Sequence, residues 1–240
     1  SYAFPKSDEN ALSNISFTAE KGETIGIIGG TGAGKSTLVN LIPRFSDVKS
    51  GSVKVFGHDV RDCKFGYLRH VIHVVPQKSN LFSGTIKDNL LMGDRSADDR
   101  DIDFALKVSQ SAEFVSKLKD GTNTLIEEKS KNLSGGQKQR LCIARAIMGH
   151  PRILIFDDSS SALDFATDAA LRKALKENLN DTTVFLVSQR VNTVKNADKI
   201  LVLDDGELVA TGTHKELYKT NEVYRDICLS QLSEKEVASV

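Results

Sequence analysis

Several features are scarce in this 240-residue sequence: cysteine, proline, net charge and long hydrophobic runs. The three cysteines, Cys63, Cys142 and Cys228, lie far apart, which argues against a disulfide framework or a zinc site. There are only 4 prolines and no low-complexity linker, so we expect one compact unit with lobes. No apolar run approaches the roughly 20 residues that a membrane-spanning helix needs.

The charged residues are balanced, with 32 Lys and Arg against 32 Asp and Glu. A protein that binds mainly a nucleic-acid backbone usually carries a basic surplus, and a polybasic segment is typical of proteins that bind anionic membrane surfaces. This sequence has neither feature, so no nucleic-acid partner is expected. The composition alone indicates a soluble globular protein and leaves its activity open.

Short apolar runs of strand type alternate with segments of helical periodicity. The predicted strands are 24–28, 52–56, 71–75, 153–156, 183–187 and 199–203. The predicted helices are 35–44, 97–115, 138–148, 165–179, 214–219 and 223–231. A hairpin turn at 204–206 (DDG) leads to a last strand at 207–210. This pattern predicts an α/β fold: a mostly parallel sheet with an antiparallel β edge, in core lobes 1–82 and 150–240, with an α-helical lobe inserted at 83–149.

Residues 29–36 read GGTGAGKS and fit the phosphate-loop pattern G-x-x-x-x-G-K-[ST], between a predicted strand and a predicted helix. Glycines let successive N–H groups converge on phosphate oxygens, and the helix start adds its positive dipole end. The Lys35 charge would meet the β and γ phosphates, and the Ser36 hydroxyl would ligate Mg²⁺. The predicted nucleotide-binding residues are Gly30, Thr31, Gly32, Ala33, Gly34, Lys35, Ser36 and Thr37. The core is therefore predicted to be a P-loop core.

A phosphate loop needs a nearby carboxylate that holds the metal ion. Asp157 follows the apolar run at 153–156, at the carboxyl end of a predicted strand, where open α/β sheets bind ligands. An acid after an apolar run is common and becomes informative only beside the phosphate loop. We therefore expect Asp157 to hold Mg²⁺, directly or indirectly.

A second glycine-rich helix start lies at 133–137 (LSGGQ). Ser134 is placed as an N-cap, and the helix that follows carries apolar residues on one side, namely Leu141, Ala144, Ile147 and Met148. Such a helix start can hold phosphate through its N–H groups and its dipole. It has no lysine, so it is half of a phosphate site; a simple capped helix is the alternative.

With the segment 133–137 the sequence resembles the ATP-binding subunits of ABC transporters, because these residues match the signature motif of that family. The resemblance implies ATP and Mg²⁺ as cofactors. Residues 75–77 (VPQ) are similar to the Q-loop, so Gln77 is expected to reach Mg²⁺ and the attacking water. Residues 161–164 (SALD) are similar to the D-loop, which places Asp164 at a dimer interface. Phe4 stands where the family has an aromatic residue that stacks on adenine.

The resemblance covers nearly the whole chain and implies a larger assembly. Residues 124–128 (TLIEE) and 81–86 (LFSGTI) are similar to exporter-type segments, the first of which contacts a membrane domain. That membrane domain, absent from this chain, is expected as a partner in the same polypeptide or complex, which places this soluble domain at the cytoplasmic face of the cell membrane. In this family two ATP-binding domains dimerise head to tail. The signature motif and D-loop of each domain complete the ATP site of the other. In this chain the residues expected to do so are Ser134, Gly135, Gly136, Gln137 and Asp164.

Two positions depart from the family pattern. Asp158 stands where the family has the Glu that polarises the attacking water, and Gln189 stands where it has the His that contacts the γ-phosphate. Asp is one methylene shorter than Glu, and a displacement of about 1 Å can cost on the order of a hundredfold in rate. Gln cannot carry a proton's charge as His can. The predicted catalytic residues are Asp158, Gln189 and Gln77. The two changes are expected to slow the site and to leave Lys35, Ser36, Gln77 and Asp157 available to bind MgATP.

We interpret the chain as the ATP-binding motor domain of an ABC exporter, an ATPase whose own site is slow. It resembles the degenerate-site subunit of heterodimeric multidrug or lipid exporters, so its partner is expected to be a second, non-identical half-transporter with Glu and His. One alternative is a soluble ABC-type ATPase that acts on DNA or ribosomes. The short stretch of sequence between the phosphate loop and Asp157 disfavours it, because it leaves no room for a long coiled coil. Another is a regulatory subunit that binds ATP without hydrolysing it. The sequence does not indicate the transported substrate.

Overall fold

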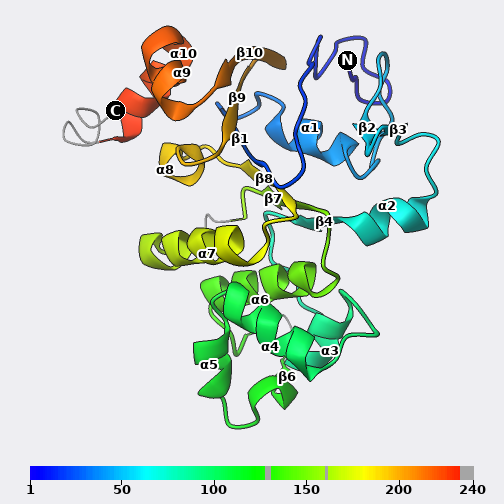
Figure 1. Ribbon diagram of the computed structural model, residues 1–240, viewed down its shortest axis with the longest axis vertical. Coiled ribbons are helices and arrows are strands. Elements are labelled where there is room, and N and C mark those ends of the chain that lie inside the picture. The colour runs from blue at the N-terminus through cyan, green and yellow to red at the C-terminus, as the bar shows by residue number, and fades with distance from the viewer. Residues whose placement is uncertain (128–130, 160–161, 233–240) are drawn as a thin grey trace. The chain divides into compact units, whose positions relative to one another are not determined.

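The computed structural model describes residues 1–127, 131–159 and 162–232 (Figure 1). The chain divides into two compact units, which we describe separately. The first consists of Ser1–Ile72 and Thr183–Val240, and the second is His73–Thr182. The lobe boundaries expected from the sequence, at 83 and 149, divide the chain differently and stay a prediction.

Four strands form the sheet of the first unit, in the order β10-β9-β1-β8. They are β1 (Thr24–Gly29), β8 (Thr183–Val187), β9 (Lys199–Asp204) and β10 (Glu207–Gly212). Strand β1 pairs in parallel with both β8 and β9, whereas β10 pairs antiparallel with β9. The β1 residues Ile25, Ile27 and Ile28 are fully buried, as expected for a parallel strand covered on both faces. The mostly parallel sheet with an antiparallel edge is thus confirmed.

The predicted turn before β10 is present and has a defined geometry. Asp205 and Gly206 both have positive φ, at 43° and 77°. Two consecutive left-handed residues are the requirement of a two-residue turn that matches the twist of the flanking strands. The same device joins β2 (Lys54–Val55) to β3 (His58–Asp59) through Phe56 and Gly57. The predicted strand at 52–56 is therefore too long, because its last residue turns the chain.

The helices of the first unit are α1 (Lys35–Leu41), α2 (Phe65–Val71), α8 (Val191–Val194), α9 (His214–Thr220) and α10 (Glu222–Gln231). The predicted helix at 35–44 is wrong at its end, because α1 stops at Leu41 and Arg44 has a left-handed φ of 58°. Val71 belongs to α2 rather than to the predicted strand, and α2 itself was not predicted. No helix among the described residues is long and apolar enough to cross a membrane.

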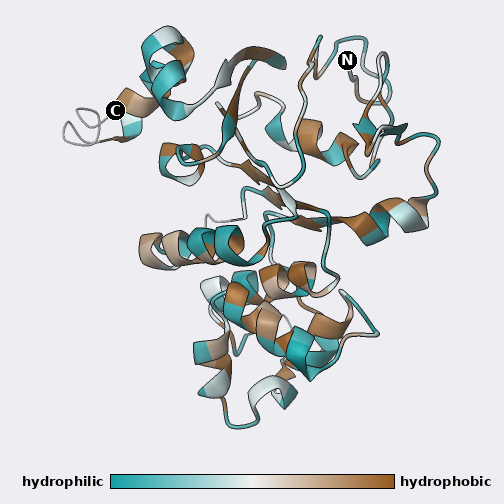
Figure 2. Ribbon diagram, in the orientation of Figure 1, coloured by the Kyte–Doolittle hydropathy of each residue, from teal (hydrophilic) through white to brown (hydrophobic). Residues whose placement is uncertain are grey.

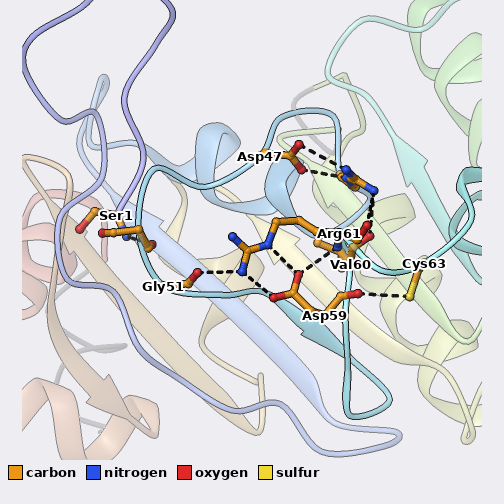
Figure 3. Close-up of polar contacts among 9 residues, drawn as sticks. Ser1, Asp47, Gly51, Asp59, Val60, Arg61 and Cys63 are labelled. Carbon is orange, nitrogen blue, oxygen red and sulfur yellow. Dashed lines mark hydrogen bonds and ion pairs between the residues drawn. The ribbon is translucent and has the colours of Figure 1, made fainter.

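Ion pairs fix the chain between α1 and α2 (Figure 3). The Arg61 guanidinium contacts both carboxylate oxygens of Asp59, at 3.0 and 2.7 Å. Arg44 pairs with Asp47 and also donates to the carbonyl oxygens of Val60 and Arg61. The side-chain and backbone hydrogen bonds from Arg61 lower the pKa of Asp59 to about 2. The ion pair between Asp59 and Arg61 therefore persists to well below neutral pH.

The second unit is predominantly helical, as predicted for the inserted lobe. Its helices are α3 (Ile86–Leu91), α4 (Asp99–Val108), α5 (Ala112–Ser116), η1 (Gly121–Asn123), α6 (Gly135–Met148) and α7 (Phe165–Asn178). Its strands are β4 (Ile72–Val75), which begins at the boundary, β5 (Gly84–Thr85), β6 (Leu125–Ile126) and β7 (Ile153–Asp157). Figure 2 shows hydrophobic residues along the strands and both classes of residue on the helices.

The single helix predicted at 97–115 is wrong, because the structure has two helices there. Gln110 breaks the pattern with a left-handed φ of 59°. The hydroxyls of Ser109 and Ser111 are fully buried and hydrogen-bond each other at 2.9 Å, so the turn between the helices is satisfied internally. The apolar periodicity continues across this turn, and for that reason the sequence predicts a single helix.

Candidate active site

The phosphate loop joins the carboxyl end of β1 to the start of α1. Gly32 and Gly34 have φ values of 85° and 89°, a region that favours glycine. Neighbouring atoms exclude side chains as well: a Cβ on Gly34 would lie 2.6 Å from a methyl carbon of Leu12, and a Cβ on Gly29 would lie 2.1 Å from the carbonyl oxygen of Leu203. The glycines of the sequence pattern are therefore required by this backbone.

The loop folds around the ammonium group of Lys35. Its Nζ donates to the carbonyl oxygens of Gly29 at 2.9 Å and Gly30 at 2.6 Å, and the residue is only 8% exposed. Ser36, the next residue, is exposed at the first turn of α1. A buried cation and glycine N–H groups suit the negative oxygens of a polyphosphate, and the exposed Ser36 hydroxyl offers one oxygen ligand of the kind that Mg²⁺ binds.

Gln189 lies at the same edge of the first unit as the phosphate loop. It follows β8, the parallel neighbour of β1, so the carboxyl ends of the two strands are adjacent. The Thr31 hydroxyl donates to the Gln189 side-chain oxygen at 3.3 Å. The structure thus brings the residue at the expected γ-phosphate position into contact with the loop.

Phe4, predicted to stack on adenine, also lies in the first unit. Its ring is 53% exposed and meets the buried ring of Tyr2 edge to face, with centroids 5.3 Å apart. An exposed aromatic ring supported from one edge can offer a face to a flat ligand.

The acidic residues Asp157 and Asp158 lie in the second unit. Asp157 ends β7, and Asp158 has a left-handed φ of 46°, a conformation that Asp adopts more readily than most residues. The Gln77 amide donates to the Asp158 carboxylate at 3.2 Å, so the predicted Q-loop residue contacts the predicted base. Ser159 is 1% exposed, and its hydroxyl has no hydrogen-bond partner among the described residues.

The glycine-rich start of α6 is built as a capping box. The Ser134 hydroxyl accepts from the Gln137 N–H at 3.2 Å, and the Gln137 side-chain oxygen accepts from the Ser134 N–H at 2.9 Å. The predicted N-cap is confirmed, and the apolar side of the helix is buried as predicted. A Cβ on Gly135 would meet no atom within 4 Å, whereas one on Gly136 would lie 3.3 Å from the carbonyl oxygen of Ala162.

Asp164 caps α7. Its carboxylate accepts from the Thr167 N–H at 2.9 Å and from the Thr167 hydroxyl at 2.8 Å, and these bonds, the backbone one first, lower the pKa of Asp164. The side chain therefore stays ionised at the exposed start of the helix. Ser161, in the same predicted D-loop, lies outside the described residues.

The two exporter-like segments are paired with each other. Gly84 lies opposite Ile126, and Thr85 lies opposite Leu125, in the two-stranded sheet of β5 and β6. The buried side chain of Asn89 holds the segment 81–86 by bonding both the N–H and the carbonyl of Phe82. Glu128, predicted to belong to the segment 124–128, lies outside the described residues.

The predicted metal ligands are not in one unit. Ser36 belongs to the first unit, whereas Gln77 and Asp157 belong to the second. The metal site and the assignment of the other site residues therefore stay predictions.

One polar residue beside the site was missed by the sequence reasoning. Gln231, the last residue of α10, hydrogen-bonds the backbone on both sides of Arg190. No motif or spacing relates it to Gln189, which is 42 residues earlier. Its only sequence signal was its place at the end of a predicted helix.

Comparison with known proteins decides the family. The family pattern described as ABC transporter matches residues 12–161, more than half of the chain. The chain belongs to the ABC transporter family. This ABC domain is 41% identical over 227 residues to a protein of Staphylococcus aureus (strain NCTC 8325 / PS 47) named as a multidrug export ATP-binding/permease protein, covering 95% of the chain and 39% of that relative.

A second relative bears the same name in the bovine strain RF122/ET3-1 of Staphylococcus aureus. It is 43% identical over 216 residues, which cover 90% of the chain and 37% of the relative. Among solved structures, a bacterial Atm1-family ABC exporter with ATP bound matches with a TM-score of 0.92 at 34% identity, over 97% of the chain and 41% of that protein. The ABC domain thus spans about two-fifths of the length of these relatives, and its fold is that of an ABC exporter ATPase domain.

Two glycines of the phosphate loop give a matched test of its geometry. We expect Gly34→Ala to lower the free energy of unfolding by about 1–2 kcal/mol, because alanine is strained at φ 89° and its Cβ would meet Leu12. We expect Gly30→Ala to change it by less than about 0.5 kcal/mol, because its Cβ meets no atom within 4 Å. Urea unfolding of both variants measures the difference, and equal midpoints would contradict this geometry.

Proposed function

We propose that this chain is the ATP-binding motor domain of a membrane exporter, and that its phosphate loop binds MgATP. The observation that carries the proposal is the glycine loop closed around the buried Lys35 ammonium, 2.9 and 2.6 Å from two loop carbonyls. Those carbonyls hold the cation in the position from which it turns to a phosphate. The 34% identity to an exporter solved with ATP bound supports the same ligand here.

The predicted site residues bind different parts of MgATP. Lys35 and the loop N–H groups bind the phosphate oxygens, and Phe4 covers the base. For the metal ion, the first unit offers Ser36 and the second unit offers Gln77 and Asp157 as ligands. When bound, Mg²⁺ neutralises phosphate charge and orients the terminal phosphate for attack by water. The exposed glycines Gly30 and Gly32 leave room for phosphates to approach the backbone closely.

Hydrolysis at this site is proposed to be slow. The Asp158 carboxylate accepts a hydrogen bond from Gln77 and is one methylene shorter than Glu, so it reaches less far toward a water. Gln189 offers an amide to the terminal phosphate and cannot take up a proton as His can. Both residues keep polar contacts, so ligand binding survives while proton handling is weakened.

The second subunit of the working dimer is proposed to be a different chain with Glu and His at these positions. The signature of this chain is structurally complete, because the capping box orders Ser134 and Gln137 at the start of a 14-residue helix. The Ser134 hydroxyl accepts one bond in the box and still has its proton to donate to a phosphate oxygen. Such a signature completes the partner's site, while Asp164 lies at the interface.

The membrane partner is proposed to dock on the paired segments at β5 and β6. Phe82 and Leu125 are 56% and 67% exposed there, so these two segments offer apolar side chains to a partner. The relatives carry the word permease in their names and extend well beyond this chain. The domain would then work at the cytoplasmic face of the membrane. The chemistry of the transported substrate would be decided in the membrane domain.

Removal of the Lys35 charge tests nucleotide binding. We expect Lys35→Met, which keeps most of the buried stem, to weaken MgATP binding about ten- to hundredfold, because charge-assisted hydrogen bonds to phosphate are lost. Titration calorimetry with MgATP measures this, and EDTA should weaken binding to the unsubstituted chain. Lys64→Met, at an exposed lysine, is the matched control. Unchanged affinity of Lys35→Met would refute the proposal.

A complementation experiment tests the slow site and the intact signature together. We expect Asp158→Glu with Gln189→His to raise the ATPase rate of the chain at least tenfold. The first change lengthens the carboxylate side chain by one methylene, and the second supplies an imidazole that can take up a proton. Adding Gly135→Asp should abolish this gain, because a negative charge at the start of α6 repels phosphate, although its Cβ has room.

Mixing this triple variant with the unsubstituted chain should restore activity, since the latter supplies a working signature. No rate gain from the double change would locate the defect elsewhere. No recovery on mixing would refute the shared site. If the unsubstituted chain fails to hydrolyse ATP even beside its activated partner, it acts as a regulatory subunit.

The docking surface is tested by charge. We expect Phe82→Asp with Leu125→Asp to abolish co-purification of the chain with the permease portion of the Staphylococcus aureus relative, because two carboxylates would be buried against apolar surface. Phe165→Asp, at a residue that is 73% exposed in the same unit, is the control and should have no effect. Retained co-purification of the double variant, or none for the unsubstituted chain, would contradict the proposed surface.

A further inference from the structure

The C-terminal helix α10 ends against the segment that carries Gln189. The Gln231 side chain is a two-point clamp: its amide nitrogen donates to the Gln189 carbonyl at 2.7 Å, and its oxygen accepts from the Val191 N–H at 2.9 Å. One planar amide thus bonds the backbone on both sides of Arg190. A pair of bonds from one rigid group fixes the direction of the segment as well as its position.

The clamp supplies an acceptor that the local sequence does not. Val191 begins α8, whose N-cap residue Arg190 makes no side-chain capping bond. The Arg190 N–H is already bonded to the Ser188 hydroxyl at 3.0 Å. Gln231 therefore acts as a cap from a distant helix, and it holds the turn between β8 and α8 in one conformation.

The helix that carries the clamp is itself firmly seated. Tyr224 and Cys228 of α10 are fully buried, and the Tyr224 hydroxyl bonds His214 of α9 at 2.8 Å. Asn221 caps the start of the helix by accepting from the Tyr224 N–H. A side chain that projects from such a support can position another residue, which a side chain on a loose tail cannot.

We propose that Gln231 is a positioning residue that holds Gln189 against the phosphate loop. Helix α10 would thereby determine how strongly the site binds the terminal phosphate of ATP. The chain of contacts is continuous in the first unit: Gln231 bonds the Gln189 backbone, and the Gln189 side chain bonds Thr31 of the loop. The inference rests on the proposed role of Gln189 at the γ-phosphate.

The test compares nucleotides with and without that phosphate. We expect Gln231→Ala in the 240-residue chain to weaken MgATP binding about fivefold and MgADP binding less than twofold, because only the triphosphate reaches Gln189. Gln231→Glu keeps the acceptor for Val191 but loses the donor to Gln189, so it should weaken MgATP binding in the same direction. Ser230→Ala, at the neighbouring exposed position, is the control.

Two further readouts separate positioning from general stability. Amide hydrogen exchange at Val191 should accelerate in Gln231→Ala and stay slow in Gln231→Glu, while the melting temperatures remain close. In a Gln189→Ala background, Gln231→Ala should change MgATP affinity no further, because the two residues act through one contact. Calorimetry on the four variants of this cycle measures the coupling.

The outcomes are distinct. Equal losses for MgATP and MgADP, or effects of Gln189→Ala and Gln231→Ala that simply add, would overturn the positioning role while leaving the proposed function intact. A Gln189→Ala variant with unchanged preference for MgATP over MgADP would overturn the proposed role of Gln189, and with it this inference.

Discussion

The contact between the Lys35 ammonium and the carbonyl oxygens of Gly29 and Gly30 is the constraint on which the first unit depends. A charge buried to 8% exposure must be paired with polar atoms, and here the loop itself provides them. Gly32 and Gly34, which have left-handed φ, allow the chain to turn from these carbonyls into α1. Strand β1, buried between β8 and β9, supplies the rigid end from which the loop starts. The Lys35 ammonium is thereby held within the loop that is proposed to bind the phosphates.

Parallel pairing extends this constraint to the rest of the site. Ile27 of β1 lies opposite Val187 of β8, so the residues that follow the two strands emerge side by side. The Ser188 N–H donates to the Ile27 carbonyl at 3.1 Å and continues the pairing up to the residue before Gln189. The Thr31–Gln189 contact is a consequence of this register. Sheet topology, rather than any local motif, brings Gln189 beside the loop.

The features that could be predicted from the sequence are those formed by residues close together in the chain. The phosphate loop and the cap at Ser134 are local patterns with a fixed spacing, and both are confirmed as structures. The split of 97–115 into two helices, the pairing of β5 with β6 and the Gln231 clamp depend on contacts between distant residues, which periodicity does not encode. Gln231 is the clearest case: an exposed glutamine at a helix end has no sequence signal until the helix is seated.

The two departures from the family pattern share a physical logic. Asp158 and Gln189 lie in different units, and each is held by hydrogen bonds inside its own unit, from Gln77 and from Thr31. Neither substitution leaves a hole or an isolated charge, so each is compatible with a stable, nucleotide-binding fold. What both lose is the handling of a proton: the shorter carboxylate lies farther from a water, and an amide does not titrate as imidazole does. The proposed slow site would therefore still bind ATP. The capping box at Ser134 is formed by residues far from both positions in the sequence, so the proposed contribution of the signature to a partner's site does not depend on either change.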